Sequence, residues 1–498
     1  MKKEFPKILL YNTLTRRKEE FQPGQTGHVS IYCCGITTNG ACHVGHARAF
    51  VVFDVIFRIL KSLGYKVHFV RNLTDIDDKV ITRAHEKGIT TIELAKENIH
   101  SFHEDAKALK LLEPTQEPRA TEHIEEICEL IQKLLKEEMA YEVNGEVFYS
   151  VKKFKDYGKL SSKKIDDLQA GARIEIGERK KDPLDFVLWK PSKEGEPSWK
   201  SPWGKGRPGW HIECSAMSQK YLGKTFDIHG GGLDLIFPHH ENEIAQSEAA
   251  YHVPLAKYWV HNGLVYLGKD KMSKSEGNIV SVKEFLKRYG AEVLRFWVLT
   301  NHYRSPLGFT QTHIKDAIVG LERFYKTSIL IDEMLDKLAL NKEKNFQKPS
   351  VLEEGLLQDV QNLYPKFQKS LLDDFNTAAA IGYVFELIRR LNHYLLDKKL
   401  RESTLTETIC RNADNVFSEI STLLGIFEED PRSYLPRLYD LLLPESMTRD
   451  KVDELIEERN AARLAKNWSR ADEIRKHLCD LKIVLEDAAE GTTWRVEV

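Results

Sequence analysis

The order of elements at the start of the chain limits the fold more than any other feature of the sequence. The apolar run 29–34 predicts a buried strand, apolar residues at helical spacing predict a helix over 45–63, and residues 66–71 indicate a second strand. A strand, a helix and a strand in this order predict a parallel sheet. Ligands of such sheets bind at the carboxyl ends of the strands, where Cys34 and His43 fall.

The size and composition of the chain limit its class and its location. With 498 residues the chain exceeds the length of a single core, so we expect about three modules. A formal net charge of −2 neither supports nor excludes an RNA-binding surface. The seven cysteines lack the spacing of a disulfide framework, and no signal peptide or membrane-length apolar run is present. We therefore expect a cytoplasmic protein with no membrane partner.

The rest of the chain is expected to complete the sheet and then to become helical. Residues 100–141 have a charged helical pattern, and Asn144-Gly145 predicts the turn of a hairpin. Three segments are predicted to return to the sheet: a strand at 226–232, a helix at 239–251 and a strand at 258–260. Beyond residue 312 the pattern is helical apart from a polar loop at 341–350, and the last fifty residues combine a helix with a strand at 492–496.

Two short motifs are typical of a nucleotide site. The first, His43-Val44-Gly45-His46, lies between a strand and a helix, where unpaired backbone N–H groups and the helix dipole favour phosphate. The second, Lys271-Met272-Ser273-Lys274-Ser275, is a polar loop whose two cations can close on pyrophosphate. Each motif alone is better explained as a helix start or as a solvated basic loop. Their combination indicates a site for ATP.

The pairing of these two motifs resembles the class I aminoacyl-tRNA synthetases, and the segments between them resemble the cysteinyl-tRNA synthetases in particular. The resemblance runs from about Leu10 to the C-terminus. Four blocks carry the closer match: NLTDIDDK at 72–79, RPGWHIECSAM at 207–217, FDIHGGGLD at 226–234 and FPHHENEIAQ at 237–246.

This resemblance implies an α/β fold with three domains. A Rossmann-type, parallel-sheet catalytic domain is expected over 1–311, with an insertion at about 115–205 and the loop 271–275. An α-helical bundle domain is expected over 312–440, and a small C-terminal α/β module that binds the anticodon is expected over 441–498. We expect the protein to act as a monomer.

The resemblance also assigns one zinc ion per chain to Cys34, Cys214, His239 and Glu243, whose thiolate, imidazole and carboxylate groups suit that metal. Strand alternation places Cys33 on the opposite face from Cys34. Helical spacing places His240 and Glu241 off the face that His239 and Glu243 share. A metal is needed because an apolar pocket separates near-isosteres such as cysteine and serine by only about 1–3 kcal/mol, whereas a thiolate binds zinc much better than an alcohol.

The activity implied by the resemblance is that of a cysteine–tRNA ligase. The carboxylate of L-cysteine would attack the α-phosphate of ATP, and the cysteinyl group would pass from the adenylate to the terminal adenosine of tRNA(Cys). Catalytic roles would fall to His43, His46, Lys271 and Lys274. ATP, accompanied by Mg²⁺, would contact Gly45, His43, His46 and Lys274. The amino-acid pocket would be lined by Thr74, Trp210 and His229.

The resemblance places anticodon recognition on the last helical stretch of the chain. An aromatic ring can stack on an unpaired base while Asp and Arg side chains read its edge. The candidate residues are Arg463, Trp468, Asp472 and Arg475. Arg459 lies on the same helical stretch.

Three other functions stay open on the sequence. A related cysteine ligase with an amine acceptor would share both motifs and the zinc ligands, but it should lack the C-terminal module. A catalytically silent protein that binds zinc and RNA is disfavoured by the intact motifs. A zinc hydrolase would need a base placed by a motif such as HExxH, which the ligand set lacks.

Overall fold

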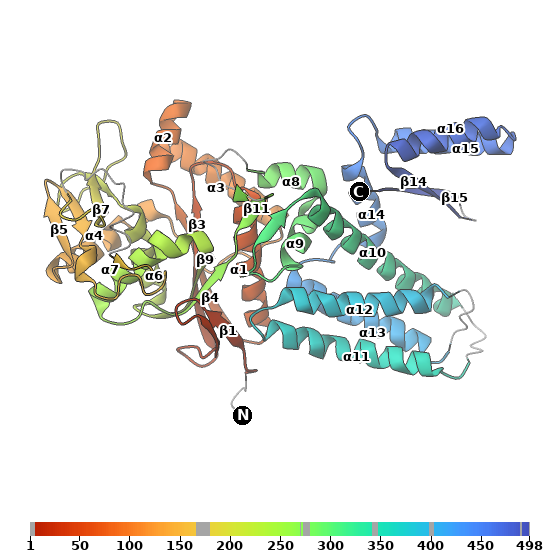
Figure 1. Ribbon diagram of the computed structural model, residues 1–498, viewed down its shortest axis with the longest axis horizontal. Coiled ribbons are helices and arrows are strands. Elements are labelled where there is room, and N and C mark those ends of the chain that lie inside the picture. Colours follow the sequence, from red (N-terminus) through yellow and green to blue (C-terminus); the bar gives the residue numbers. More distant parts are fainter. Residues whose placement is uncertain are drawn as a thin grey trace. The chain divides into compact units, whose positions relative to one another are not determined.

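The computed structural model describes residues 5–165, 180–268, 270–271, 279–340, 347–397, 403–488 and 491–497 (Figure 1). The chain forms two compact units. The first contains Met1–Val282, Asn301–Gly308 and Gln368–Ala380, and the second contains Lys283–Thr300, Phe309–Phe367 and Ile381–Val498. The predicted division into three domains stays a prediction. Within the described ranges no helix is both long and apolar enough to cross a membrane.

A four-stranded parallel sheet forms the base of the first unit, which confirms the predicted fold class. Its strands lie in the order β10 (Ala256–Asn262), β9 (Phe226–Gly232), β3 (His28–Thr37) and β4 (Lys66–Thr74). Helix α1 (Val44–Ser62) joins β3 to β4 and buries its apolar residues against the sheet, as the spacing predicted. The four carboxyl ends therefore share one edge, where the predicted site residues of β3, β4 and β9 come together.

Strand β3 carries a bulge near its carboxyl end. Its register with β4 shifts between Cys33 and Ile36, so that Cys34 and Gly35 together lie opposite Asn72. A bulge of this kind bends the strand locally and changes the direction of a side chain. Cys34 therefore owes its direction to an irregular segment and not to simple strand alternation.

A large insertion between β4 and β9 forms helices and a separate antiparallel sheet. Its helices are α2 (Asp78–Lys87), α3 (Thr91–Ala108) and α4 (Ile124–Lys136), and its strands, in the order β5-β6-β7-β8, are Ala140–Val143, Glu146–Tyr149, Phe186–Pro191 and Gly206–Pro208. The predicted hairpin turn is confirmed, with φ of 51° at Asn144 and 79° at Gly145. The predicted helical region 100–141 is wrong in its middle, because Pro114 and Pro118 lie between α3 and α4.

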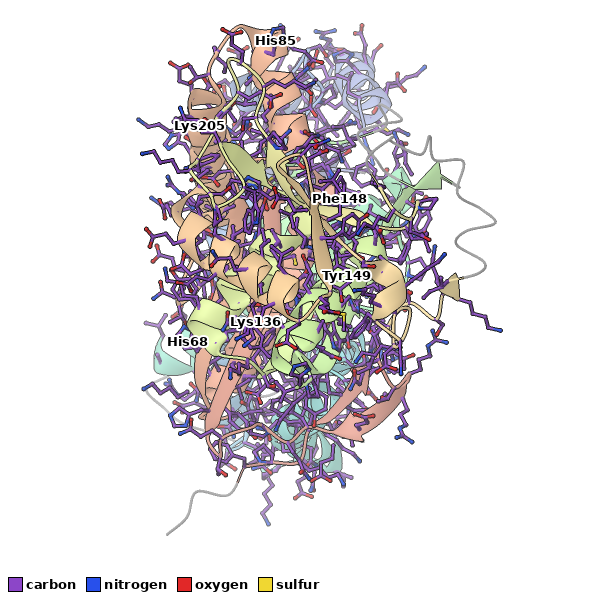
Figure 2. All side chains as sticks on the ribbon, turned by 90° about the vertical axis from the view of Figure 1, so that its left-hand side faces the viewer. His68, His85, Lys136, Phe148, Tyr149 and Lys205 are labelled. Atoms are coloured by element: carbon purple, nitrogen blue, oxygen red, sulfur yellow. The ribbon has the colours of Figure 1, made fainter. Side chains whose placement is uncertain are left out.

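The insertion sheet is tied to helix α7 (Glu241–Tyr251), which follows β9 in the first unit. Figure 2 labels Phe148 and Tyr149 on strand β6 and Lys136 at the end of α4. Tyr149 is fully buried, and its hydroxyl donates a hydrogen bond of 2.8 Å to the backbone oxygen of Ala245. The insertion therefore supports the helix that carries Glu243.

Helix α7 begins later than the sequence predicted. Phe237 has extended backbone angles (φ −137°, ψ 130°), and the wide turn Ile236–His240 leads into the helix at Glu241. His239 and His240 therefore lie in this turn and not in regular α-helix. Arguments from α-helical spacing do not apply to them.

The second unit is almost wholly helical over its described residues, as predicted. Helices that lie in it wholly or in part are α8 (Val282–Tyr289), α9 (Ala291–Leu299), α10 (Gln311–Leu340), α11 (Val351–Leu371), α12 (Thr377–Leu395), α13 (Thr406–Leu424) and α14 (Pro431–Leu442). Of the predicted loop 341–350, residues 341–346 lie outside the described residues. Residues 347–350 precede α11.

The C-terminal segment of this unit has its own small core. Helices α15 (Arg449–Leu464) and α16 (Trp468–Asp480) pack with the hairpin β14 (Ile483–Ala488) and β15 (Gly491–Val496) around buried Val452, Leu478 and Ile483. The predicted strand is confirmed, but the single predicted helical stretch is two helices. Lys466 has φ of 57°, and the Asn467 side chain accepts a hydrogen bond from the Arg470 N–H, which starts a new helix.

Candidate metal centre and nucleotide pocket

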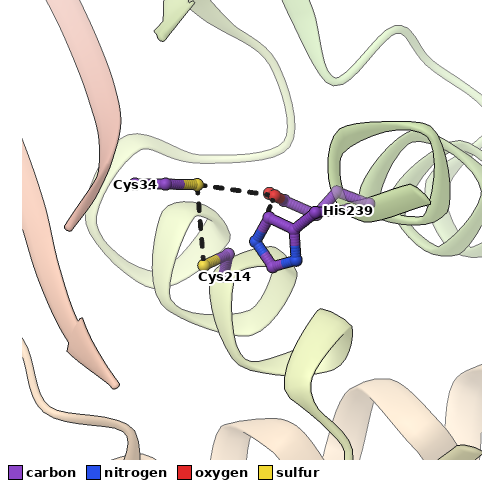
Figure 3. Close-up of side chains that lie close together, drawn as sticks. Cys34, Cys214 and His239 are labelled. Carbon is purple, nitrogen blue, oxygen red and sulfur yellow. Dashed lines mark hydrogen bonds and ion pairs between the residues drawn. The ribbon is translucent and has the colours of Figure 1, made fainter. Parts of the chain in front are cut away.

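Four side chains from distant parts of the chain meet at the carboxyl end of β3. Figure 3 labels three of them, Cys34, Cys214 and His239. Cys34 comes from the bulge of β3, Cys214 from α6 (Trp210–Leu222), His239 from the turn before α7, and Glu243 from the first turn of α7. All four are buried, and one donor atom from each lies within 4.8 Å of the others. These are the residues that the family resemblance assigns to a metal.

The distances between the donor atoms suit a single metal ion. Cys34 Sγ lies 3.9 Å from Cys214 Sγ and 3.7 Å from Glu243 Oε1, and His239 Nε2 lies 3.0 Å from that oxygen. Ligands at their usual bond lengths around a tetrahedral zinc ion are separated by roughly 3.3–3.8 Å. The cluster can therefore hold a metal ion with two sulfur donors, one nitrogen donor and one oxygen donor.

A second group of donors overlaps the first. His229 and His240, together with Cys34 and Glu243, also place one donor atom each within 4.8 Å of one another. The expectation that His240 lies off the site is wrong, since its Nε2 is 3.3 Å from Cys34 Sγ. The reason is the wide turn at 236–240, which allows two consecutive histidines to face the same centre.

The charges within the cluster favour a cation. The hydrogen bond from the Cys34 thiol lowers the pKa of Cys214 to about 6 although burial opposes this. Burial would raise the pKa of Glu243, but His229 and His239 hold it well below its usual range. Burial would lower the pKa of His239, but the Glu243 carboxylate raises it to about 10. At neutral pH the buried cluster therefore contains a thiolate, a carboxylate and a protonated His239. A bound metal cation would take the place of the imidazole proton between the two anionic groups.

Aromatic rings and a further histidine hold the ligands in place. Trp210 stacks on His239 with ring centroids 4.3 Å apart, and His211 Nδ1 lies 2.9 Å from His239 Nδ1. A partner on the second ring nitrogen orients a histidine ligand. The sequence prediction missed His211. Its place on α6, about one turn before Cys214, could have indicated it.

His240 also has a partner that sequence reasoning missed. Its Nδ1 lies 2.8 Å from His261 Nε2, and His261 Nδ1 lies 2.9 Å from Thr13 Oγ1. Burial lowers the pKa of His261 to about 3, so this ring is neutral. No spacing in the sequence connects residue 261, on β10, with the turn before α7.

Two of the three residues predicted for the amino-acid pocket contact the cluster, and the third contacts the residue that precedes Cys214. Trp210 covers His239, and His229 Nε2 lies 2.8 Å from Glu243 Oε2. The Thr74 hydroxyl, at the end of β4, donates a hydrogen bond of 3.1 Å to Glu213 Oε2. Glu213 was not predicted, although it directly precedes Cys214 in the chain.

The His43–His46 motif forms the start of α1, as predicted. The rings of His43 and His46 stack with centroids 3.7 Å apart, and the His43 N–H donates a hydrogen bond of 3.3 Å to His46 Nδ1. The expectation that the first helical N–H groups are unpaired is wrong for Val44, which donates to the Val280 oxygen at 3.0 Å. This hydrogen bond places the segment that follows the 271–275 loop beside the motif.

A cavity of about 610 Å³ extends from Cys34 of the Cys/His/Glu cluster to this motif. Cys34 and Trp210 line it beside the cluster, and His43, Gly45 and His46 line it at the start of α1. A methyl group on Gly45 would lie 2.9 Å from the His43 ring, so a larger residue would crowd this wall. The cavity is large enough for an amino acid joined to a nucleotide.

Of the loop 271–275 only Lys271 is described. Lys271 belongs to β12 (Asp270–Lys271), which pairs with β11 (Val265–Leu267), and Ser281 pairs with His43. Residues 272–278, including Lys274, lie outside the described residues, and so does the side chain of Lys271. The described residues that flank this gap, Lys271 and Ser281, therefore pair with Tyr266 and His43, and His43 lines the cavity.

The predicted anticodon residues lie on the C-terminal segment of the second unit. Trp468 is 58% exposed at the start of α16, and Asp472 and Arg475 are exposed on the same helix. Arg463 on α15 pairs with Asp487 at 3.0 Å. Arg459 is instead buried and makes two hydrogen bonds to Asp487, so its role is to hold β14 against α15.

Comparison with known proteins agrees with this architecture. The family model described as tRNA synthetases class I (C) catalytic domain matches residues 20–319, the DALR domain matches 366–428, and the cysteinyl-tRNA ligase anticodon binding domain matches 448–495. Among solved structures, a methionyl-tRNA synthetase of Mycobacterium tuberculosis has a TM-score of 0.59 at 17% identity and covers 84% of this chain and 92% of its own. That likeness supports the fold alone.

Several relatives match over nearly the full length, among them two cysteine–tRNA ligases. The cysteine–tRNA ligase of Geotalea uraniireducens is 50% identical over 493 residues, and that of Geobacter metallireducens is 48% identical over 491 residues. Both alignments cover 98% of this chain and 100% of the relative. On this extent of identity and coverage, the chain belongs to the cysteinyl-tRNA synthetases, a family of class I aminoacyl-tRNA synthetases.

Proposed function

We propose that the chain is a cysteine–tRNA ligase, which activates L-cysteine with ATP and transfers the cysteinyl group to tRNA(Cys). The observation that carries this proposal is the cavity between the buried Cys/His/Glu cluster and the His43–His46 motif. It offers a thiol-binding end and a nucleotide-binding end within one pocket. The full-length match to relatives named cysteine–tRNA ligase supports the same activity.

The proposed resident metal is zinc, held by Cys34, Cys214, His239 and Glu243. Their donor chemistry and separations fit this ion. When bound, zinc supplies a Lewis acid that prefers the thiolate of cysteine to the hydroxyl of serine. Trp210, Thr74 and His229 would enclose the amino acid beside this centre and exclude water from it.

The proposed reaction is an in-line displacement at the α-phosphate of ATP. A carboxylate oxygen of cysteine forms a bond to the α-phosphorus, and the bond to the oxygen that bridges to the β-phosphate breaks, which releases pyrophosphate. Gly45 leaves room for the adenosine. His43, His46, Lys271 and Lys274 would stabilise the charge that moves onto pyrophosphate, and ATP is expected to carry Mg²⁺.

The proposed acceptor is the terminal adenosine of tRNA(Cys). We assign the catalytic domain to 1–311, the helical domain to 312–440 and the anticodon-binding module to 441–498, and we expect a monomer. Trp468, exposed beside Asp472 and Arg475, offers a ring on which an unpaired base can stack. Arg463 would add a cation to this surface.

Aminoacylation of total tRNA with each amino acid in turn tests the proposed function. Zinc-loaded protein is expected to attach cysteine to tRNA. It should attach serine only at a negligible rate. Attachment of another amino acid, or equal rates for cysteine and serine, would contradict the proposal.

Exchange of pyrophosphate into ATP separates the proposal from its alternatives. A cysteine–tRNA ligase and a ligase with an amine acceptor should both catalyse the cysteine-dependent exchange, but only the first charges tRNA. Absence of exchange would favour a silent protein that binds zinc and RNA.

Substitution of Trp468 by alanine tests the anticodon surface. We expect the change to weaken tRNA binding by about 1–3 kcal/mol, because one stacked base loses its platform. Cysteine-dependent pyrophosphate exchange should stay unchanged, since the cavity is in the other unit. The measurement is the KM for tRNA(Cys), with Leu464→Ala as a control at an exposed apolar residue outside the predicted set. Equal tRNA affinity in both variants would remove Trp468 from the surface.

A further inference from the structure

A chain of hydrogen bonds connects the two cysteines of the metal cluster through residues that are not ligands. The Gly35 N–H donates to Asn72 Oδ1 at 3.0 Å, and Asn72 Nδ2 donates to Thr74 Oγ1 at 3.3 Å. The Thr74 hydroxyl in turn donates to Glu213 Oε2 at 3.1 Å. Gly35 directly follows Cys34 and Glu213 directly precedes Cys214, so this relay runs from one ligand to the other.

The first part of the relay holds the bulge that carries Cys34. Asn72 lies opposite Cys34 and Gly35. The bulge interrupts the backbone hydrogen bonds between β3 and β4, and the Asn72 side chain accepts the hydrogen bond from the Gly35 N–H instead. The strands are also in close contact here, because a Cβ on Gly35 would lie 1.7 Å from the Asn72 backbone oxygen. Asn72 and Thr74, two residues apart on β4, present their side chains on one face of the sheet. The direction of Cys34 thus depends on β4.

The last part of the relay attaches helix α6 to that face. Glu213 is fully buried, and its neighbours Asp75 and Asp77 are also acidic. Glu213 Oε1 has no hydrogen-bond partner among the described residues. A buried carboxyl group without a cation is costly, and an apolar residue would pack there at lower cost. Its evident contribution is the hydrogen bond to Thr74.

We propose that Asn72, Thr74 and Glu213 are positioning residues that set the separation of Cys34 and Cys214 and thereby the zinc affinity of the cluster. This inference rests on the proposed role of zinc. Groups that orient metal ligands typically change metal affinity by about 10- to 100-fold when they are removed. The relay places the thiolates independently of the ATP end of the cavity.

The test compares two replacements of Glu213 in the full-length protein. Glu213→Met removes the acceptor but keeps a similar volume, and Glu213→Gln keeps an acceptor for the Thr74 hydroxyl. Zinc affinity is measured by competition with a chelator, and the cobalt-substituted proteins are compared by their thiolate-to-metal absorption. We expect Glu213→Met to weaken zinc about 10- to 100-fold and to shift the cobalt spectrum. The zinc affinity of Glu213→Gln should stay within about 3-fold of that of the original protein, which is a smaller change than the loss expected for Glu213→Met.

Two further measurements separate positioning from a loss of stability. Glu292→Met removes a buried carboxylate that accepts from the Tyr325 hydroxyl in the other unit, and it should leave zinc affinity unchanged. Thr74→Val breaks the relay at its middle with a smaller change and carries the test if Glu213→Met does not fold. The combination of Thr74→Val and Glu213→Met should lose no more zinc affinity than the stronger single variant.

The outcomes distinguish the inference from the proposed function. If the original protein binds no zinc tightly, the zinc role fails and this inference fails with it. If it binds zinc and folded Glu213→Met and Thr74→Val bind it equally well, only the relay is wrong. Equal losses of zinc affinity in Glu213→Gln and Glu213→Met would also overturn the relay. Glu213→Gln keeps the acceptor for Thr74, so an equal loss would assign the effect to the carboxylate charge and not to the hydrogen bond. For Glu213→Met, whose residue is not part of the proposed amino-acid pocket, the expected kinetic signature is a raised KM for cysteine with an unchanged KM for ATP.

Discussion

Cys214→Ser will lose tightly bound zinc and raise the KM for cysteine by more than about 100-fold, while the KM for ATP changes little. Removal of a group that only orients a ligand costs up to about 100-fold in metal affinity, and Cys214 is itself a proposed ligand. Its thiol lies 3.9 Å from that of Cys34, whereas ATP is expected at the other end of the cavity. Metal analysis gives the zinc content, and pyrophosphate exchange at varied cysteine or ATP gives each KM.

The matched control for this substitution is Cys410→Ser. Cys410 is fully buried in α13 of the second unit, so the change also places a hydroxyl in a buried site but leaves the cluster untouched. It should keep its zinc and its KM for cysteine. Unchanged cysteine affinity in Cys214→Ser would remove this residue from the site. Equal loss of cysteine and ATP affinity would indicate general disruption of the pocket.

His46→Ala will reduce the rate of cysteine-dependent pyrophosphate exchange by about 10²- to 10³-fold, with little effect on the KM for cysteine. Loss of one group that stabilises charge in a transition state has an effect of this size. His46 lines the cavity with His43 and stacks on its ring, whereas the cysteine thiol is expected beside Cys34, which also lines the cavity. The measurement is kcat for exchange under saturating ATP and cysteine.

His46 also helps to start α1, and a second variant separates the two roles. His46→Asn keeps an acceptor for the His43 N–H but lacks the imidazole ring. If the ring acts on the triphosphate, both variants should be slow. Recovery of the rate in His46→Asn would instead assign His46 to the helix start. His28→Ala, at an exposed histidine of β3, serves as the control and should keep its full rate.

Much of the fold could be predicted because its signals are local. The strand at 29–34, the helix at 45–63 and the Asn144-Gly145 turn follow from the pattern of neighbouring residues, and the structure confirms them. The errors occur where a local pattern is interrupted. The helical pattern at 100–141 contains two prolines, and the last helical stretch is broken at Lys466, where one residue in the left-handed region reverses the chain.

The candidate site was only partly predictable for a different reason. The resemblance identified Cys34, Cys214, His239 and Glu243, and the structure brings them together. Neither strand alternation nor helical spacing could describe their true surroundings. His239 and His240 lie in a wide turn, so helical spacing gave the wrong answer for His240. The choice of Cys34 over Cys33 agrees with the cluster, although Cys34 lies in a bulge.

The sequence by itself determined the types of donor, the segments that form the parallel strands and the two motifs at the nucleotide end, because each depends on residue identity or on short-range spacing. Only the tertiary structure decided that His240 and His261 approach the cluster, and that Asn72, Thr74 and Glu213 connect the two cysteines. Those contacts join segments that are remote along the chain. Their geometry depends on how β3, β4, α6 and α7 pack, and no local pattern encodes that packing.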